Sequence, residues 1–551
     1  MKLPRPAFII AVLCLAVFQF SENTADPDLW SHVFFGRQFV QTGKPTTIDY
    51  YSWTAYGQPS FDHEYLGEAV FGLTYLCLGG PGLLLLKIVV GLLTFGIALL
   101  MNRRQGQAPG PPVDHVSGSK AGARGSVPLT GDQVSAKNIM LVAWAFGALA
   151  VVEISFGFAA RPQVFTALFL AFELWLLRRV HSRHWSWVLV FPPMFALWFN
   201  LHGGALAGLV LLFIAAAATS AQIALTSFAP KTGRRLPSNV PVRAACALWL
   251  SAVISAGTVI LNPHGIGLAR WLIGSVLWLR PQIQEWNPTG FTWDHAAFFF
   301  CAAFAAASFI LSRRRRPLWE PAVLAVLFIV GFRAVRNTPL FCIAALALVP
   351  PHLTDMLLRF RGSWRRFEEL FRLQSVQRFL TVVLVWVSLG IIAATLTLHK
   401  KHFWTMEVPR LRYPVAAIQF IRQHELRGNL LVFFDWGEMC IWDLPDSKVS
   451  IDGRLDSVYS PAVIAAHWKL YNGQSFNTNV LSLDRADFAL LPSTLYGAKA
   501  LAQQDRWRAV YYDDCAVVLV KNVAEFPKLA GLVLPVHGPA SATEGRDPFP
   551  N

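Results

Sequence analysis

Long apolar runs, separated by short polar segments, fill the first three quarters of the chain. A helix needs about 20 residues to cross a bilayer core of about 30 Å, and these runs reach or approach that length. The pattern predicts transmembrane helices at 7–20, 82–101, 138–156, 162–178, 185–200, 203–225, 244–262, 295–311, 317–332, 338–351 and 379–398. The sequence therefore predicts a mainly α fold, a polytopic transmembrane helical bundle of about 11 spans.

The pattern changes beyond residue 401, where short alternating runs predict a small soluble α/β domain over 402–535. Its expected helices and strands are 414–424 and 436–444, and 429–434, 448–451, 487–491, 508–512 and 516–520. The transmembrane domain then covers 1–401. Two segments rich in small and polar residues, an insertion at 102–137 and a tail at 536–551, are predicted to be disordered.

Clusters of Lys and Arg predict which loops face the cytoplasm. All of these clusters fall on one side of the membrane, together with Lys2 and Arg5, if the apolar segment 65–79 lies at the outer surface instead of crossing the bilayer. The clusters are Arg103-Arg104, Arg178-Arg179 with Arg183, Lys231 with Arg234-Arg235, Arg313 to Arg316, and 359–378. This predicts a cytoplasmic N-terminus, a first helix that is retained rather than cleaved as a signal peptide, and an external C-terminal domain.

The composition favours a membrane-embedded chain. Of the 551 residues, 54% are hydrophobic and 15% are charged, whereas a soluble domain carries about 25% charged residues. The mean hydropathy is +0.42. The net charge of +15 does not indicate nucleic acid, because the basic residues stand in short clusters between apolar runs, as in loops of membrane proteins.

The first external loop, residues 21–64, holds a dense group of acids and histidines. Asp26 and Asp28 stand just beyond the first span. Two carboxylates at this spacing suit a general base that activates an acceptor hydroxyl, or a pair of ligands for a divalent cation such as Mg²⁺ or Mn²⁺. The alternative is an ordinary N-cap for a surface helix that begins near Leu29.

His63 and Glu64 follow Asp62 at the end of the same loop. A histidine beside a carboxylate can orient a substrate or share a proton, so both are candidate catalytic residues. The alternative is that they cap the segment 65–79 and form a polar rim.

Four basic residues are candidates for binding a phosphate. Arg161, Arg333 and Arg336 fall on the predicted external side, where arginine is disfavoured, and the planar guanidinium suits phosphate. Lys87 lies about one helical turn inside the outer end of its span, where it binds a phosphate or extends its amine to the interface. The alternative for the arginines is ion pairs with the acids of 21–64.

Two further histidines, His202 in NLHGG and His264 in LNPHG, stand beside glycines on the external side. We include them as candidate substrate-binding residues, although a lone histidine there is more often structural. Glu173 lies within a predicted span, where an acid is a functional candidate or a hydrogen-bond partner of a neighbouring helix.

The C-terminal domain carries Asp435, Asp452 and Arg454 just after predicted strands. Loops after strands often carry function, but turn and packing roles are favoured for these three. Cys440 and Cys515 are predicted to form a disulfide in an oxidising compartment.

The loop DPDLWSHVFFGRQFVQTGKPTTIDYYSWTAYGQPSFDHEYLGE resembles that of a group of mostly uncharacterised bacterial membrane proteins, as do ARPQVF, LHGG, LNPHG, EWNP, RAVRN, DWGE and DGR further on. The overall plan resembles the type-C glycosyltransferase superfamily: a first span, D-x-D in a large external loop with a surface helix, a many-helix bundle and a C-terminal soluble domain.

The resemblance implies a sugar donor carried on a polyprenyl phosphate or diphosphate, and transfer on the external face of a bacterial inner membrane, with a periplasmic C-terminal domain. Carried over, Asp26 or Asp28 is the base or a metal ligand; no other cofactor is implied. The acceptor is a glycan, a lipid or a protein. The W-W-D type signature of oligosaccharyltransferases is absent from the sequence, which argues against protein N-glycosylation. The alternative function is a non-catalytic membrane transporter or envelope assembly factor, although no internal repeat typical of carriers is visible.

Overall fold

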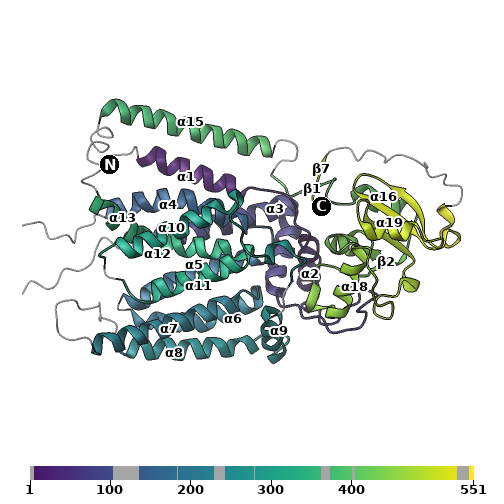
Figure 1. Cartoon of the computed structure of the whole chain (residues 1–551), viewed down its shortest axis with the longest axis horizontal. Helices are drawn as coiled ribbons and strands as arrows, with labels where there is room; N and C mark the ends of the chain where they lie inside the picture. The colour runs from purple at the N-terminus through teal and green to yellow at the C-terminus, as the bar shows by residue number, and fades with distance from the viewer. Residues whose placement is uncertain are drawn as a thin grey trace, which may run out of the picture.

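A computed structural model describes residues 5–103, 136–182, 184–228, 242–277, 280–314, 316–360, 373–399, 404–529 and 545–550. The insertion predicted to be disordered at 102–137 lies almost entirely outside these residues, as does most of the tail from residue 536. The described chain forms a long helical bundle with a β-sheet at one end (Figure 1).

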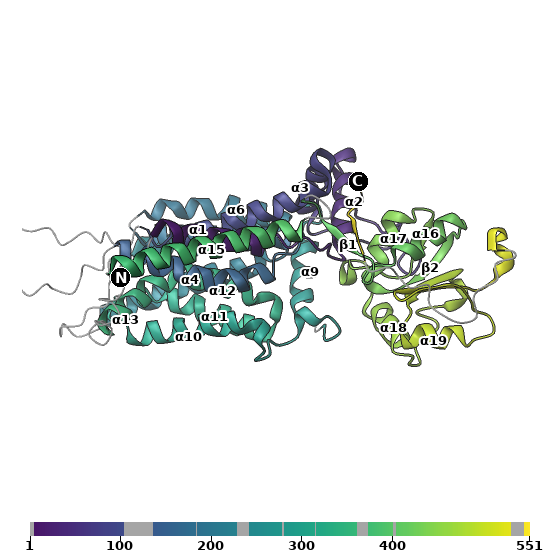
Figure 2. The same cartoon turned by 90° about the horizontal axis from the view of Figure 1, so that it is seen from above.

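Each predicted apolar segment coincides with a helix of the bundle, and these helices run side by side along its long axis (Figures 1 and 2). They are α1 (Arg5–Phe20), α3 (Tyr65–Leu100), α4 (Ala136–Phe156), α5 (Gln163–His181), α6 (Phe191–Leu201), α7 (Ala205–Phe228), α8 (Val242–Gly257), α10 (Ala296–Leu311), α11 (Trp319–Arg333), α12 (Thr338–Leu348) and α15 (Gln374–Leu398). Helix α9 (Ile266–Leu277) lies across the bundle end next to the sheet, and α13 (Pro350–Arg359) lies at the opposite end.

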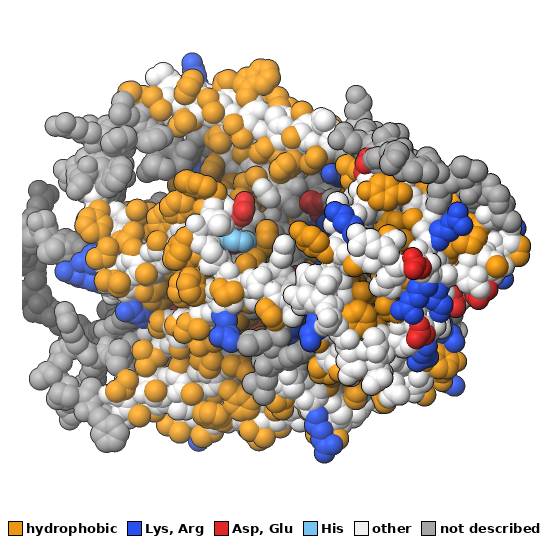
Figure 3. Space-filling view, turned by 45° about the vertical axis from the view of Figure 1, so that its right-hand side comes forward, with side chains coloured by type: hydrophobic (Ala, Val, Ile, Leu, Met, Phe, Trp, Pro, Cys, Tyr) orange, Lys and Arg blue, Asp and Glu red, His pale blue; other side chains and the backbone are white. Residues whose placement is uncertain are grey.

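Six helices among the described residues are long and apolar enough to cross a membrane, or seven if the bent pair formed by α12 and α13 is one span. Helix α15 has a mean hydropathy of 2.4, yet only 11% of that window is buried inside the protein. Apolar side chains also cover the flank of the bundle seen in Figure 3. Lipid must therefore cover the apolar surface that the protein itself does not bury, and the chain is a multi-pass membrane protein.

The ambiguous segment 65–79 is the first part of α3, and it is separated from the rest by a kink at Gly79. Gly79 has φ 63° and ψ −154°, a conformation open to glycine but strained for other residues, and Pro81 follows within the helix. The chain thus changes direction at the boundary where the charge pattern predicts a surface helix to meet a span.

The two ends of the bundle have different polar residues. At the end away from the sheet, the Arg178 guanidinium is 3.2 Å from the Glu320 carboxylate and donates to the carbonyl oxygens of Met101 and Ala347 at 3.0 and 3.3 Å. These contacts bring α3, α5, α11 and α12 together at the end predicted to be cytoplasmic.

The C-terminal part contains a five-stranded sheet in the order β3-β2-β4-β6-β5. Strand β2 (Gly428–Val432) pairs in parallel with β3 (Ser447–Val449) and β4 (Phe488–Pro492), whereas β6 (Ala516–Val520) runs antiparallel to β4 and to β5 (Arg508–Tyr512). Helices α16 (Val415–Gln423), α17 (Gly437–Asp443), α18 (Pro461–Tyr471) and α19 (Tyr496–Ala502) accompany it. The five predicted strands and two predicted helices coincide with observed elements.

Two expectations for this part are wrong. Cys440 and Cys515 are separate, buried free thiols, so the predicted disulfide is not formed. Each packs in the interior as a small apolar residue. The tail is not disordered over its last residues, because β7 (Arg546–Pro548) pairs with β1 (Glu407–Pro409) and Phe549 is fully buried. The Phe549 ring packs against Trp30 and so anchors the otherwise polar end of the tail.

The first external loop connects the bundle with the sheet. Its helix α2 (Leu29–Thr42) packs along the first part of α3, and both lie between the bundle and the sheet (Figures 1 and 2). Beyond α2, the Trp53 indole donates to the carbonyl of Leu430 at 3.2 Å, and the Arg454 guanidinium is 2.8 Å from the Asp49 carboxylate. The loop is therefore a structural layer rather than a flexible connection.

Glycines make the packing of α2 on α3 possible. A Cβ on Gly36 would lie 1.8 Å from the backbone oxygen of Glu68, and one on Gly72 would lie 2.3 Å from the backbone of Gly36. Two helices approach this closely only where neither carries a side chain at the crossing.

We expect Gly36→Ala to destabilise the protein, because the added methyl group meets backbone that cannot rotate away; overpacking of this kind costs about 1–3 kcal/mol. Thermal unfolding in detergent measures the effect. Gly96→Ala is the matched control, since a Cβ there meets nothing within 4 Å. Equal melting temperatures for the two variants would contradict the close packing of α2.

Candidate active site

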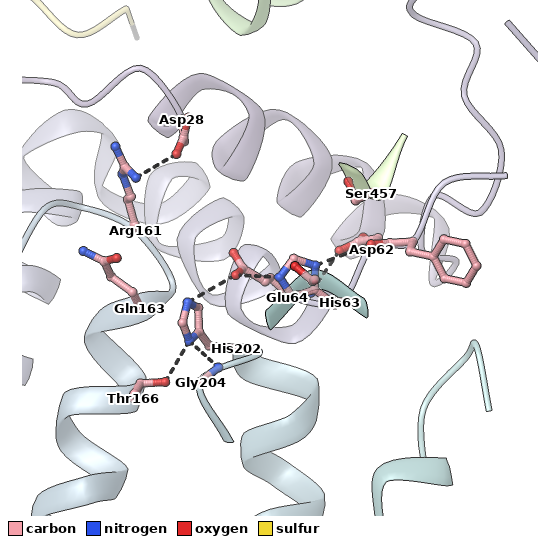
Figure 4. Close-up of polar contacts among 12 residues, drawn as sticks. Asp28, Asp62, His63, Glu64, Arg161, Gln163, Thr166, His202, Gly204 and Ser457 are labelled. Atoms are coloured by element: carbon pink, nitrogen blue, oxygen red, sulfur yellow. Dashed lines mark hydrogen bonds and ion pairs between the residues drawn. The ribbon is translucent and has the colours of Figure 1, made fainter. Parts of the chain in front are cut away.

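Asp26 and Asp28 both contact Arg161 at the bundle end that faces the sheet. Nε and Nη2 of Arg161 bind the two oxygens of Asp26, with Nη2 and Oδ2 2.6 Å apart. The remaining nitrogen, Nη1, lies 3.0 Å from Oδ2 of Asp28 (Figure 4). Asp28 occupies the N-cap position of α2, but its side chain makes no capping hydrogen bond. The interpretation of Asp28 as an ordinary helix cap is therefore wrong.

The two carboxyl groups have different acidities. Burial raises the pKa of Asp28 to about 6, with Asp26 adding to the rise and Arg161 opposing it. Burial acts in the same direction on Asp26, but Arg161 outweighs it and lowers the pKa of that residue. Neighbouring carboxyl groups with separated pKa values are typical of sites that assign them different roles. Asp26 is the permanent anion here, and Asp28 is the group able to exchange a proton near neutral pH.

A third carboxylate, from Glu285, lies between two guanidinium groups. Its Oε1 is 3.1 Å from Nη1 of Arg336 and 3.7 Å from Nη1 of Arg161. The Arg336 guanidinium also lies 4.5 Å from the ring centre of Trp286, a cation–π distance. The loops QEWNP and RAVRN, which follow α9 and α11, thus meet the D-x-D segment across the end of the bundle.

Glu64 is the centre of a second group of contacts. Nε2 of His63 and Nε2 of His202 lie 3.0 and 3.3 Å from its Oε1 (Figure 4). The backbone N–H of Gly204 donates to Nδ1 of His202 at 2.9 Å, and the Thr166 hydroxyl lies 2.8 Å from the same atom. Since Nδ1 accepts, the proton of His202 belongs on Nε2, which donates to Glu64.

Electrostatics separate the two histidines on Glu64. Burial lowers the pKa of His202 to about 4, so this ring is neutral at pH 7. Burial also disfavours the charged form of His63, but Glu64 outweighs it and raises the pKa of His63. Glu64 itself is kept ionised, since His63 and His202 together overcome its burial and lower its pKa. An ionised Glu64 thus stands between His63, whose pKa is raised, and a neutral His202.

The structure brings most of the sequence-predicted residues into one polar region. His32 on α2 lies between the two groups, where its pKa responds to Glu64, Asp28 and Arg161 after the larger effect of burial. The Nε2 of His264 contacts the backbone carbonyl of Asp62 at 3.1 Å, which is a structural contact at the edge of this region.

Lys87, Arg333 and Glu173 are placed differently. The Lys87 amine donates to the backbone carbonyl of Glu22 and is 3.4 Å from its carboxylate, so it ties the start of the first loop to α3. Arg333 is exposed and makes no ion pair with any described residue. Glu173 is fully buried within α5, and neither carboxyl oxygen has a hydrogen-bond partner among the described residues.

One functional candidate of the C-terminal part, Glu438 on α17, was missed as a neighbour of D-x-D. A Cβ built on Gly453 would lie 2.6 Å from Oδ1 of Asp28 and 2.6 Å from Oε1 of Glu438, so the two oxygens lie within twice that distance of each other. Glu438 is 3% exposed. The signal was present in DWGE and DGR, but nothing in the sequence indicated that these runs approach residue 28.

Asp452 and Arg454, by contrast, have the structural role that the sequence favoured. The Arg454 guanidinium binds Asp452 at 2.7 and 2.9 Å and Asp49 at 2.8 Å, and Tyr459 donates to Asp452 at 2.5 Å. These contacts hold the sheet on the first external loop.

The D-x-D pair does not fit a divalent cation in this arrangement. No group of three or more His, Cys, Asp or Glu residues within the described parts of the chain is placed to hold a metal ion. Both carboxylates are already bound to the Arg161 guanidinium, whose charge would repel a cation at the same place.

Comparisons with known proteins agree on one architecture. No protein-family model matches the chain, and no curated protein matches it in sequence. Among solved structures, ArnT from Cupriavidus metallidurans bound to undecaprenyl phosphate is similar over 96% of this chain and 98% of its own, with a TM-score of 0.50 and 13% identity. The chain therefore shares the fold of this protein.

The same fold relates the chain to the oligosaccharyltransferase of Archaeoglobus fulgidus in its apo form. That similarity covers 95% of this chain and 75% of the other, with a TM-score of 0.51 and 12% identity. One of the two solved proteins is thus an oligosaccharyltransferase, and the other binds undecaprenyl phosphate. At these identities the comparisons establish the fold, and the site residues of this chain must be argued from its own geometry.

We expect Glu64→Gln to lower stability most at mildly acidic pH. A raised pKa stabilises the folded state fully below the unfolded value, about 6.5 for His63, and the benefit is lost as pH rises through the folded value. The lowered pKa of Glu64 adds stability above about pH 4.3. The difference in free energy of unfolding between the unaltered protein and Glu64→Gln, measured by thermal unfolding, should therefore peak near pH 5 to 6, at about 1.5–3 kcal/mol, and shrink by pH 9. A difference that grows toward pH 9 would contradict the charged pair.

Proposed function

We propose that the protein is an integral-membrane glycosyltransferase that moves a sugar from a polyprenyl-phosphate donor to an acceptor on the external face of a bacterial inner membrane. The observation that carries the proposal is the cluster of Asp28, Arg161, Glu285 and Arg336 at the sheet-facing end of a type-C glycosyltransferase fold. This cluster combines a proton acceptor with a place for a bound anion.

In the proposed reaction, Asp28 accepts the proton of an acceptor hydroxyl. The hydroxyl oxygen attacks the anomeric carbon, the bond between that carbon and the phosphate oxygen breaks, and the polyprenyl phosphate leaves with the electron pair. The pKa of about 6 for Asp28 leaves it mostly ionised at neutral pH while keeping it basic enough to act. Asp26, which binds Arg161 through two nitrogens, positions the guanidinium.

The phosphate would occupy the position that the Glu285 carboxylate holds between Arg161 and Arg336. Three carboxylates already surround these two guanidinium groups. A phosphate that arrived while Glu285 stayed would meet an excess of negative charge, so Glu285 must move away as the donor binds. The guanidinium groups then stabilise the charge that grows on the leaving phosphate.

The membrane arrangement belongs to the same proposal: about 11 spans, a cytoplasmic N-terminus, a transmembrane domain over 1–401 and a periplasmic α/β domain over 402–535. The separation of Arg178 and Arg161 to opposite ends of α5 supports this orientation, since Arg178 belongs to a basic cluster and Arg161 does not.

We expect Asp28→Asn to abolish transfer, because the amide cannot accept the proton. In a strain that lacks the native protein, cells carrying Asp28→Asn should accumulate the same polyprenyl-linked sugar as the empty strain, detected by mass spectrometry of extracted lipids. Asp294→Asn, an exposed residue at the same end of the bundle, is the control and should restore the normal lipid profile.

Transfer that continues at the normal level in a well-folded Asp28→Asn protein would refute the role of Asp28. A lipid profile that is unchanged in the empty strain would count against glycosyl transfer altogether and favour the transporter or assembly-factor function.

We expect Arg336→Gln to weaken the binding of undecaprenyl phosphate at least about tenfold, the equivalent of about 1.4 kcal/mol, while Glu285→Gln should strengthen it, because the resident anion is removed. Native mass spectrometry of the detergent-solubilised protein measures both. Arg333→Gln removes a guanidinium from the end of α11, just outside the cluster, and should leave binding unchanged. Equal affinities for Arg336→Gln and Arg333→Gln would contradict this phosphate position.

A further inference from the structure

A cavity of about 400 Å³ opens in the C-terminal part at the ends of two parallel strands. Phe433, Asp435 and Trp436 follow β2, Pro492 ends β4 and Thr494 follows it. In open α/β sheets, ligands bind in the crevice beyond the carboxyl ends of the strands. The size is within the range of small-molecule sites, about 300–1,000 Å³. Nothing in the proposed chemistry of Asp28 and Arg161 accounts for this cavity.

The lining combines one partly exposed aromatic ring with several polar groups. Phe433 is half-buried, whereas Tyr413 and Trp436 are 0% and 3% exposed. Asp435 and Asp514 supply carboxylates, Arg412 a guanidinium and Thr494 a hydroxyl. The Asp435 carboxylate makes no hydrogen bond or ion pair with any residue in the described part of the chain, and burial raises its pKa. Asp435 is half-buried, so its oxygens can accept hydrogen bonds from water or from a bound ligand.

The charges disfavour an anionic ligand. The lining carries two carboxylates, Asp435 and Asp514, and one guanidinium, Arg412, and Arg412 partly offsets the rise that burial causes in the pKa of Asp435. A phosphate or carboxylate would meet the two carboxylates, and an amine would meet Arg412. A sugar ring fits this lining, because its hydroxyl groups both donate and accept while a C–H face packs on the Phe433 ring.

The cavity adjoins the D-x-D segment. Tyr413 lines it, and the Tyr413 hydroxyl donates to the carbonyl of Ala25 at 2.8 Å; Ala25 immediately precedes Asp26. Asp26 and Arg161 both influence the pKa of Asp435, after burial and Arg412. A ligand in the cavity would therefore lie on the sheet side of the carboxylates, opposite the bilayer from which a lipid-linked donor arrives.

We propose that this cavity is the acceptor site, and that it binds a neutral, polyhydroxylated group such as an uncharged sugar residue of a glycan. The inference rests on the proposed function and deepens it by naming the acceptor class. Asp435 and Thr494 bind hydroxyl groups that do not react, and the reacting hydroxyl extends toward Asp28.

Thr494→Trp tests the site by filling the cavity from its rim, where Thr494 is exposed. Gln503→Trp, an equal change at an exposed position on the same part of the chain, is the matched control. The full-length protein in lipid nanodiscs is mixed with methyl glucoside, methyl mannoside, methyl galactoside, N-acetylglucosamine and glucuronate, and saturation-transfer NMR records which of them bind. We expect a signal from at least one neutral sugar, none from glucuronate, and loss of the signal in Thr494→Trp but not in Gln503→Trp.

The same two variants are then compared in the strain that lacks the native protein. Thr494→Trp should accumulate the lipid-linked donor as Asp28→Asn does, yet bind undecaprenyl phosphate with unchanged affinity, whereas Gln503→Trp should restore transfer.

The outcomes separate the two proposals. If Asp28→Asn accumulates donor but Thr494→Trp transfers normally, the acceptor site is wrong and the enzyme stands. Binding of glucuronate alone, or of neutral sugars that Thr494→Trp still binds, also overturns the acceptor site. If no variant accumulates donor, glycosyl transfer itself fails, whatever the cavity binds.

Discussion

The guanidinium of Arg161 sets the arrangement on which the rest of this site depends. A guanidinium keeps its charge in any protein environment, so a mostly buried one must be paired with acids. Its partners come from two loops far apart in sequence, Asp26 and Asp28 before α2 and Glu285 after α9. Pairing this one charge fixes the D-x-D segment against the bundle and leaves a carboxylate where a phosphate would bind.

The first external loop is the second constraint, because it is packed on both sides. Helix α2 lies on α3 through a glycine contact, and the residues beyond α2 bind the sheet through Trp53 and Asp49. The sheet is consequently held beside the carboxylates rather than free in solution. This gives the proposed reaction two directions of approach, the donor from the bilayer and the acceptor from the cavity in the sheet.

Neighbouring ionisable groups in this region differ in charge because burial and pairing act on each to different degrees. Asp26 has two nitrogens of Arg161 and stays ionised, while Asp28 has one and titrates higher. Glu64 raises the pKa of His63 against the effect of burial, whereas His202 accepts a backbone N–H on Nδ1 and is neutral. Such graded acidity suits proton transfer next to a bound anion.

The sequence by itself determined the helices, the strands and the side of the bundle on which the site lies, because apolar run length, alternation and basic clusters act locally along the chain. It also selected Asp26, Asp28, Arg161 and Arg336. It could not distinguish a helix cap from an ion pair at Asp28 or place Glu285 between two arginines. Nor could it separate Arg333 from this cluster or bring Glu438 beside residue 28. It also misjudged the tail, where Phe549 is buried, and the two separate cysteines. Those contacts join residues far apart in the chain, 135 positions for Arg161 and Asp26 and more for Asp28 and Glu438, so only the packing of the helices and the sheet decides them.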